Sequence, residues 1–167
     1  MVYEKELTEI SKAGIRYLVV GGIALFLHRH PRLTDDLDII PDLEQENLAK
    51  LTNVLKDLGY KPKLPYVTID DFKDQQKRKS WITEKHMKAF SLINDRLIPY
   101  NVIDLLIASP LNFEESYKRR HIENLDGVEI PVASLEDLLT LKLEANRAKD
   151  FADIIVLQKF ILRRKDD

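Results

Sequence analysis

Apolar residues are spaced along the chain in two ways, and each spacing predicts one kind of element. Where they recur every three to four residues, as at Leu48, Leu51 and Leu55, the pattern predicts an amphipathic helix. Such patterns predict helices over residues 2–13, 23–30, 43–58, 111–119, 134–148 and 150–162. Short apolar runs rich in β-branched residues predict strands over residues 16–20, 37–40, 61–68, 89–93, 100–107 and 128–132. The interleaved order predicts an α/β (α+β) fold, with a small mixed sheet flanked by helices and further helices at the C-terminus.

Breaking and capping residues set several of these boundaries. Pro31 and Gly59 end the helices that precede them, and Ser134, with an acidic residue three positions later, is a capping-box start. Two prolines within 61–68 restrict that strand to a sheet edge. Residues 69–80 are rich in charge and fit either a solvated helix or a mobile loop.

The 167 residues, 44% of them hydrophobic and 32% charged, predict one globular domain over 1–167. We expect its core over about 14–108 and a helical C-terminal part over about 134–163. No apolar run approaches the length of a membrane span, and the acidic N-terminus does not resemble a targeting signal. The chain has no cysteine, which excludes disulfides and thiolate chemistry. We therefore expect a cytoplasmic protein without membrane contact.

The charge balance limits the kinds of partner. Lysine and arginine number 26 against 28 aspartates and glutamates, for a formal net charge of −2. A protein held on nucleic acid mainly by electrostatics is normally more basic. The composition therefore argues against a general nucleic-acid coat, whereas an RNA end bound by a local patch stays open.

Two carboxylates mark the strand predicted at 37–40. Residues two apart on a strand point to the same face, so Asp36 and Asp38 project together while Leu37 and Ile39 enter the core. Paired carboxylates repel each other and need a compensating cation. Mg²⁺ or Mn²⁺, which prefer oxygen ligands, suit this pair. A calcium loop of the EF-hand type is excluded because its glycine and distal glutamate are missing.

A third carboxylate, Asp104, lies inside the strongly apolar run 102–107. A buried charge must be paired, hydrogen-bonded or metal-bound. Taken alone, such a residue is more often satisfied structurally. Placed beside the strand of Asp36 and Asp38, it would complete a three-carboxylate metal cluster.

Gly21 and Gly22 follow the first predicted strand and precede a helix. Such a turn allows the backbone to approach an anion closely and directs free helix N–H groups at it. On its own a glycine pair usually marks only a turn. The sequence matches neither the dinucleotide-binding GxGxxG pattern nor the P-loop.

These features together resemble the DNA polymerase β-type nucleotidyltransferase superfamily. The resemblance is carried by Val19-Val-Gly-Gly-Ile-Ala24, by Arg32-Leu-Thr34, by Asp36-Leu-Asp38 and by Asp104. Within the superfamily, the chain is most similar to small bacterial AbiEii-like, toxin-type nucleotidyltransferases, because of the pattern over 134–142 followed by Arg147, Lys149-Asp150 and Asp153. Residues 61–99 are not covered. Ile23 occupies a position where serine is common.

The resemblance implies transfer of a nucleoside monophosphate from an NTP, with ATP the expected donor, to a hydroxyl-bearing acceptor with release of pyrophosphate. Asp36, Asp38 and Asp104 would be both the catalytic residues and the ligands of Mg²⁺ or Mn²⁺. The expected nucleotide contacts are Gly21, Gly22, Arg32, Thr34, Lys142, Arg147 and Lys149. If a helix continues through Asp150, Lys142 and Lys149 share one polar stripe, which could also be a solvated face.

The acceptor stays open among tRNA, an antibiotic or other small molecule, and a protein. An antitoxin protein is a further expected partner. The main alternative is a degenerate copy of the same fold that binds a nucleotide or a partner without catalysis, which Ile23 favours and the retained three aspartates oppose. A glycosyltransferase or a haloacid-dehalogenase-type phosphatase would explain Asp36 and Asp38 alone.

Overall fold

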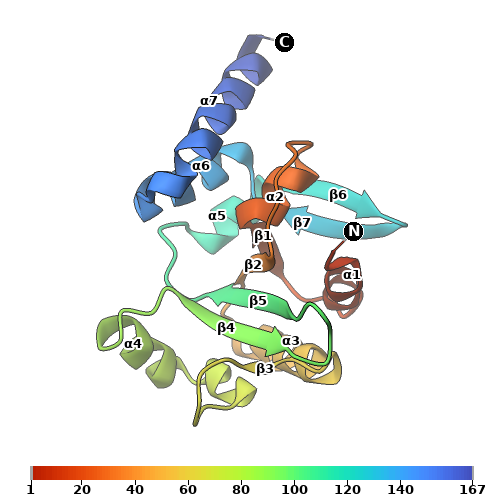
Figure 1. The fold of residues 1–167 in the computed structure, drawn as a ribbon, viewed down its shortest axis with the longest axis vertical. Coiled ribbons are helices and arrows are strands. Elements are labelled where there is room, and N and C mark those ends of the chain that lie inside the picture. The colour runs from red at the N-terminus through yellow and green to blue at the C-terminus, as the bar shows by residue number, and fades with distance from the viewer. Residues whose placement is uncertain (1, 167) are drawn as a thin grey trace.

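A mixed seven-stranded sheet forms the centre of the computed structural model, which describes residues 2–166 (Figure 1). Its strands are β1 (Tyr17–Val20), β2 (Asp36–Pro41), β3 (Lys61–Pro62), β4 (Ala89–Asn94), β5 (Asn101–Leu106), β6 (His121–Leu125) and β7 (Val128–Val132). They lie in the order β3-β4-β5-β2-β1-β7-β6. β2 therefore lies near the middle, antiparallel to β1 and parallel to β5.

The helices pack around this sheet. They are α1 (Glu4–Lys12), α2 (Gly21–Leu27), α3 (Gln45–Asp57), α4 (Gln75–Thr83), α5 (Phe113–Lys118), α6 (Leu135–Ala145) and α7 (Phe151–Asp166), with two 3₁₀ turns, η1 (Ile69–Lys73) and η2 (Ala148–Asp150). In Figure 1, α6 and α7 lie at the end of the molecule opposite α3, α4 and β3. The predicted fold class, a mixed sheet with flanking and C-terminal helices, is confirmed.

Side-chain caps account for several helix starts. Ser134 accepts a hydrogen bond from the amide of Asp137 at 3.1 Å, as the capping pattern predicts. Glu44 and Asp74 cap α3 and α4 in the same way. The helices and the sheet enclose a core that includes the apolar side chains of the strands. Among its fully buried residues are Leu37, Ile39, Ile103 and Leu105.

The charge-rich stretch 69–80, for which the sequence left a solvated helix or a mobile loop open, forms η1 followed by α4. Three other features differ from what the sequence predicted. The edge strand predicted over 61–68 shrinks to two residues, and β6 was not predicted because Ile122 and Leu125 are flanked by polar residues. The helix predicted to reach 148 ends at Ala145, where Asn146 adopts a left-handed conformation with φ 46°. Lys142 and Lys149 therefore do not share a helical stripe.

No helix among residues 2–166 is long and apolar enough to cross a membrane.

Candidate active site

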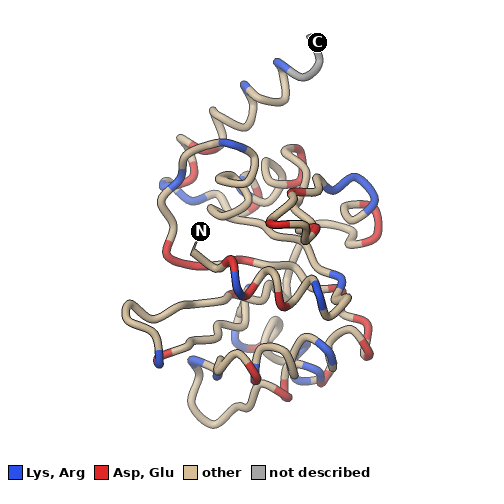
Figure 2. The backbone as a smooth tube through the Cα atoms, turned by 90° about the vertical axis from the view of Figure 1, so that its right-hand side faces the viewer, with Lys and Arg blue, Asp and Glu red and all other residues tan. Residues whose placement is uncertain are grey.

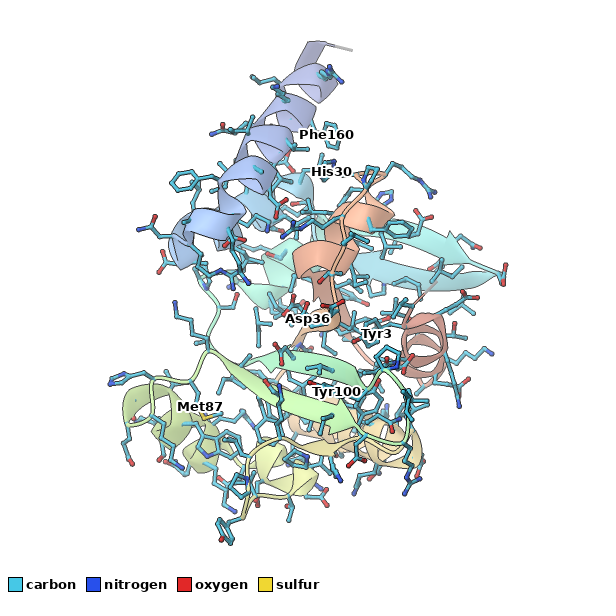
Figure 3. All side chains as sticks on the ribbon, viewed as in Figure 1. Tyr3, His30, Asp36, Met87, Tyr100 and Phe160 are labelled. Carbon is cyan, nitrogen blue, oxygen red and sulfur yellow. The ribbon has the colours of Figure 1, made fainter. Side chains whose placement is uncertain are left out.

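The two central parallel strands bring the three predicted metal-ligating aspartates together. Asp36 and Asp38 lie two residues apart on β2, and Asp38 pairs directly with Asp104 of β5. One carboxylate oxygen from each residue lies within 4.8 Å of the other two. In Figure 3 the label of Asp36 marks this position, between the strand of Asp104 below and α2 above. The sequence pattern that placed Asp36 and Asp38 on one face therefore also places them against Asp104.

The electrostatics of this cluster leave it short of positive charge. The pKa of Asp38 is raised to about 7, mainly by burial and also by the neighbouring charges of Asp36 and Asp104, while Arg147 and Lys142 act in the opposite direction. Oδ1 of Asp104 is buried and has no hydrogen-bond partner among the described residues. A buried, unpartnered carboxylate oxygen is unfavourable unless a cation reaches it.

The residues present fit a divalent metal. Three carboxylates supply hard oxygen donors only, the ligand set that Mg²⁺ and Mn²⁺ prefer over the nitrogen and sulfur ligands of zinc. The unpartnered oxygen of Asp104 and the raised pKa of Asp38 are both relieved by such an ion.

The glycine pair makes room for the aspartate strand and its loop. Gly21 has φ +68°, and a Cβ atom added there would lie 2.0 Å from Oδ2 of Asp38. A Cβ atom on Gly22 would lie 2.6 Å from Cβ of Thr34, whose hydroxyl donates to Oδ1 of Asp36 at 2.7 Å. From the sequence, the glycines are explained by the close approach of a phosphate. The structure adds a second reason, because the side chains of Asp38 and Thr34 occupy the space that larger residues at these two positions would need.

A buried ion-pair network connects the C-terminal helices to this site. Lys142 of α6 donates to Asp150 at 3.2 Å and to Asp153 at 2.7 Å. Burial would raise the pKa of Asp150, but hydrogen bonds from Arg147 and Lys142 lower it instead. Arg32, from the loop before β2, lies 3.4 Å from Asp153. Three of the predicted nucleotide-contacting cations thus belong to one network.

Arg147 extends from this network toward the aspartates. Its hydrogen bond to Asp150 raises the pKa of its guanidinium, and the nearby charges of Asp38 and Asp36 raise it further. Lys149 is exposed and does not line the cavity next to the aspartates. The predicted roles of the seven nucleotide-contacting residues stay predictions.

A cavity of about 630 Å³ opens beside the aspartates. Its walls come from the ends of β1 and α2, from β2, α4, β4 and β5, from the segment after β5, and from α6 and the residues after it. They comprise Val20, Gly21, Asp38, Ile82, Lys88, Ala89, Asp104, Leu106, Ile107, Ala108, Ser109, Pro110, Leu138, Leu141, Lys142, Glu144, Ala145 and Arg147. This volume is in the range of ordinary small-molecule sites.

Several of these residues were not predicted from the sequence. Ile82 and Lys88 lie in the stretch 61–99, and their neighbours in the chain carry no motif. The segment 107–110 follows the end of β5, two residues after Asp104, so its proximity to the site could have been inferred from the end of that strand. Leu138 of α6 is buried against the core, and it also lines the cavity.

A strand with two aspartates, a third aspartate on the neighbouring parallel strand and a glycine turn beside them define the nucleotidyltransferase class. The fold is shared with solved structures of that class at low sequence identity. TM1012 of Thermotoga maritima, assigned as a nucleotidyltransferase, has a TM-score of 0.54 and 16% identity, with 97% of this chain and 94% of that one covered. ANT(2")-Ia in complex with adenylyl-2"-tobramycin has a TM-score of 0.57 and 14% identity, with coverages of 96% and 87%. The lincosamide antibiotic adenylyltransferase LnuA, bound to lincomycin, has a TM-score of 0.55 and 18% identity, with coverages of 94% and 93%.

The family follows from the sequence itself. The family model described as "Nucleotidyl transferase AbiEii toxin, Type IV TA system" matches residues 7–166. The chain therefore belongs to the AbiEii nucleotidyltransferase toxin family and is a nucleotidyltransferase. No match to the chain was found among curated proteins.

Proposed function

We propose that this nucleotidyltransferase moves a nucleoside monophosphate from an NTP to a hydroxyl-bearing acceptor at the three aspartates, with Mg²⁺ or Mn²⁺ bound there. The observation that carries the proposal is the cluster of Asp36, Asp38 and Asp104, in which one carboxylate oxygen of each residue lies within 4.8 Å of the other two, together with the buried and unpartnered Oδ1 of Asp104. Divalent ions held by such a cluster neutralise the charge that builds up on the phosphates during transfer. Asp36 and Asp38 would hold both ions, and Asp104 the one on the acceptor side.

The chain's own residues would prepare the reactants. The acceptor oxygen attacks the α-phosphorus, the bond from that phosphorus to the bridging oxygen breaks, and pyrophosphate leaves. Asp104 would take the proton of the acceptor hydroxyl, for which the two groups must come within hydrogen-bond reach. Arg147, the Gly21-Gly22 turn and the network of Lys142 and Arg32 would contact the triphosphate.

ATP is the proposed donor, because the two antibiotic-modifying enzymes of this fold are described by an adenylyl product and as an adenylyltransferase. The acceptor would enter through the cavity beside Asp104, whose walls are largely aliphatic. In the described part of the chain, acidic and basic residues are interleaved along the backbone (Figure 2). This distribution favours as acceptor a small molecule, or one end of a tRNA or protein, over a long nucleic acid bound along a basic surface.

The family description names a type IV toxin–antitoxin system. We accordingly propose that the transfer is harmful to the cell and that an antitoxin protein counteracts it. The expected place of reaction is the cytoplasm.

A transfer assay tests the proposal. The protein is incubated with MgCl₂, with each of the four NTPs labelled on the α-phosphate, and with one acceptor at a time: tRNA, an aminoglycoside, a lincosamide or total protein. Label transfer is expected with the wild-type chain and should be lost in Asp36→Asn and Asp38→Asn. Asp57→Asn, at the exposed end of α3, makes the same chemical change outside the cluster and should retain transfer.

Label on the γ-phosphate should instead leave as pyrophosphate. Transfer that survives both cluster substitutions would refute the metal mechanism. Binding of NTP without transfer to any acceptor, with or without Mn²⁺, would favour the degenerate binding module.

A further inference from the structure

One tyrosine hydroxyl joins the two strands that carry the aspartates. The hydroxyl of Tyr3 donates to the carbonyl oxygen of Asp35 at 2.6 Å and accepts from the amide of Val102 at 3.0 Å. Asp35 directly precedes β2 and Asp36, whereas Val102 lies in β5 two residues before Asp104. In Figure 3, Tyr3 lies beside α1 and close to Asp36.

This bridge lies where the pairing of the two strands begins. Asp36 of β2 pairs with Val102 of β5, and two residues further on Asp38 pairs with Asp104. Backbone carbonyl and amide groups at the start of a parallel ladder must find partners, and here one hydroxyl serves one group from each strand. The hydroxyl therefore holds the strand starts together at the point where three like charges would push them apart.

Tyr3 is held firmly in this position. Its side chain is 2% exposed, and its backbone has φ 66° in the left-handed region, which a residue with a bulky side chain adopts only when its surroundings require it. Burial raises the pKa of Tyr3 to about 12, so the hydroxyl keeps the proton that it donates to Asp35.

The next turn of α1 strengthens the same attachment. The buried carboxylate of Glu6 accepts from the side-chain amide of Asn101 at 3.1 Å and from the hydroxyl of Tyr60 at 2.7 Å. α1 thus holds β5 at two consecutive residues, Asn101 through Glu6 and Val102 through Tyr3. Of these two contacts, only that of Tyr3 also includes the aspartate strand.

We propose that Tyr3 is a positioning residue: its hydroxyl sets the starts of β2 and β5 against each other, and thereby the spacing of Asp36 and Asp104 at which the site binds divalent cations. The part that concerns cations rests on the proposed function. Tyr3 does not line the cavity beside the aspartates, and its effect passes through the backbone of the two strands, which its hydroxyl contacts.

The substitution Tyr3→Phe removes the hydroxyl and keeps the ring, and Tyr17→Phe is its matched control. Tyr17 is also fully buried, and its hydroxyl bonds Ser11 at 2.8 Å and the carbonyl of Leu7 at 3.4 Å, so its loss also affects α1 without touching Asp35 or Val102. Three measurements on the full chain compare the variants: Mn²⁺ affinity by calorimetry, kcat and KM of nucleotidyl transfer, and hydrogen exchange of peptides covering 34–41 and 100–106.

Tyr3→Phe is expected to weaken Mn²⁺ binding by about five- to tenfold, the amount that one buried hydrogen bond contributes. It should lower kcat more than it changes KM for NTP, and it should speed exchange in both peptides. Tyr17→Phe should lower the melting temperature comparably and leave Mn²⁺ affinity and both peptides unchanged.

Unchanged exchange in the two peptides of Tyr3→Phe would overturn the proposal, and so would equal Mn²⁺ affinities of the two variants. A wild-type chain that binds no Mn²⁺ would instead contradict the proposed function. In that case the exchange data still decide whether Tyr3 joins the strands.

Discussion

Replacing Gly21 by alanine tests whether the glycine turn exists for the sake of Asp38. The added Cβ atom would lie 2.0 Å from Oδ2 of Asp38, where real contacts do not fall below 3.0 Å. The carboxylate must therefore move by about 1 Å, and a displacement of that size among reacting groups lowers a rate by about 10²-fold. We expect kcat of nucleotidyl transfer to fall by at least this factor.

Gly14→Ala supplies the control for the backbone. Gly14 has φ +66°, almost the value of Gly21, but a Cβ atom there would meet nothing within 4 Å. Both substitutions place alanine in the left-handed region, at about 1–2 kcal/mol of stability each. Only Gly21→Ala additionally displaces a site residue.

The assay is label transfer from α-labelled NTP at saturating Mg²⁺, with urea denaturation of each variant. Equal losses of stability with a large loss of activity in Gly21→Ala alone would support the reasoning. Gly21→Ala activity within a few-fold of Gly14→Ala would refute it, because Asp38 would then tolerate displacement.

Three further predictions follow from charge and burial. The pKa of Asp38 in the folded protein, about 7, lies above the ordinary aspartate value of 3.8. The metal-free folded protein therefore binds a proton that the unfolded chain has lost between these pH values, and its melting temperature should fall as pH rises from about 4 to 7. Asp38→Asn should flatten that slope, and a slope unchanged by the substitution would contradict the assignment. Asp104→Asn should lower kcat by about 10²-fold or more with the chain still folded, as measured by transfer and circular dichroism; near-normal kcat would remove Asp104 from proton transfer and ion binding. Lys142→Met should lower the free energy of unfolding in urea by about 3 kcal/mol, because two buried carboxylates lose their shared partner. Lys149→Met, at an exposed position, should change it by less than about 0.5 kcal/mol. Similar losses in both variants would show that the buried network does not hold α6 and α7 together.

Local patterns were sufficient for the class of enzyme, and they indicated part of its candidate site. The two-residue spacing of Asp36 and Asp38 on an apolar strand depends only on the alternation of side chains along an extended backbone. The glycine turn and the capping residue Ser134 are equally local, because each acts on its own few neighbours. The fold class and the nucleotidyltransferase family were accordingly predicted correctly from sequence.

Other features could not be predicted because they depend on residues far apart in the chain. That Lys142 is held by Asp150 and Asp153 follows from the break at Asn146, which turns α7 back onto α6. A continuous helix, as the spacing suggested, would have placed Lys142 beside Lys149 instead. The cavity walls from α4 carry no motif, because what they share is a position in space.

By itself, the sequence determined which residues could form a metal site and which face of a strand they would occupy, since both are set by side-chain chemistry and a repeat of two. Only the tertiary structure decided that Asp104 lies opposite Asp38 and that the carboxylate of Asp38 occupies the space beside Gly21. It also decided that Tyr3, 32 residues before Asp35 and 99 before Val102, joins the two strands. These three features depend on strand order and packing. Each is a contact between residues that come together only when the chain folds.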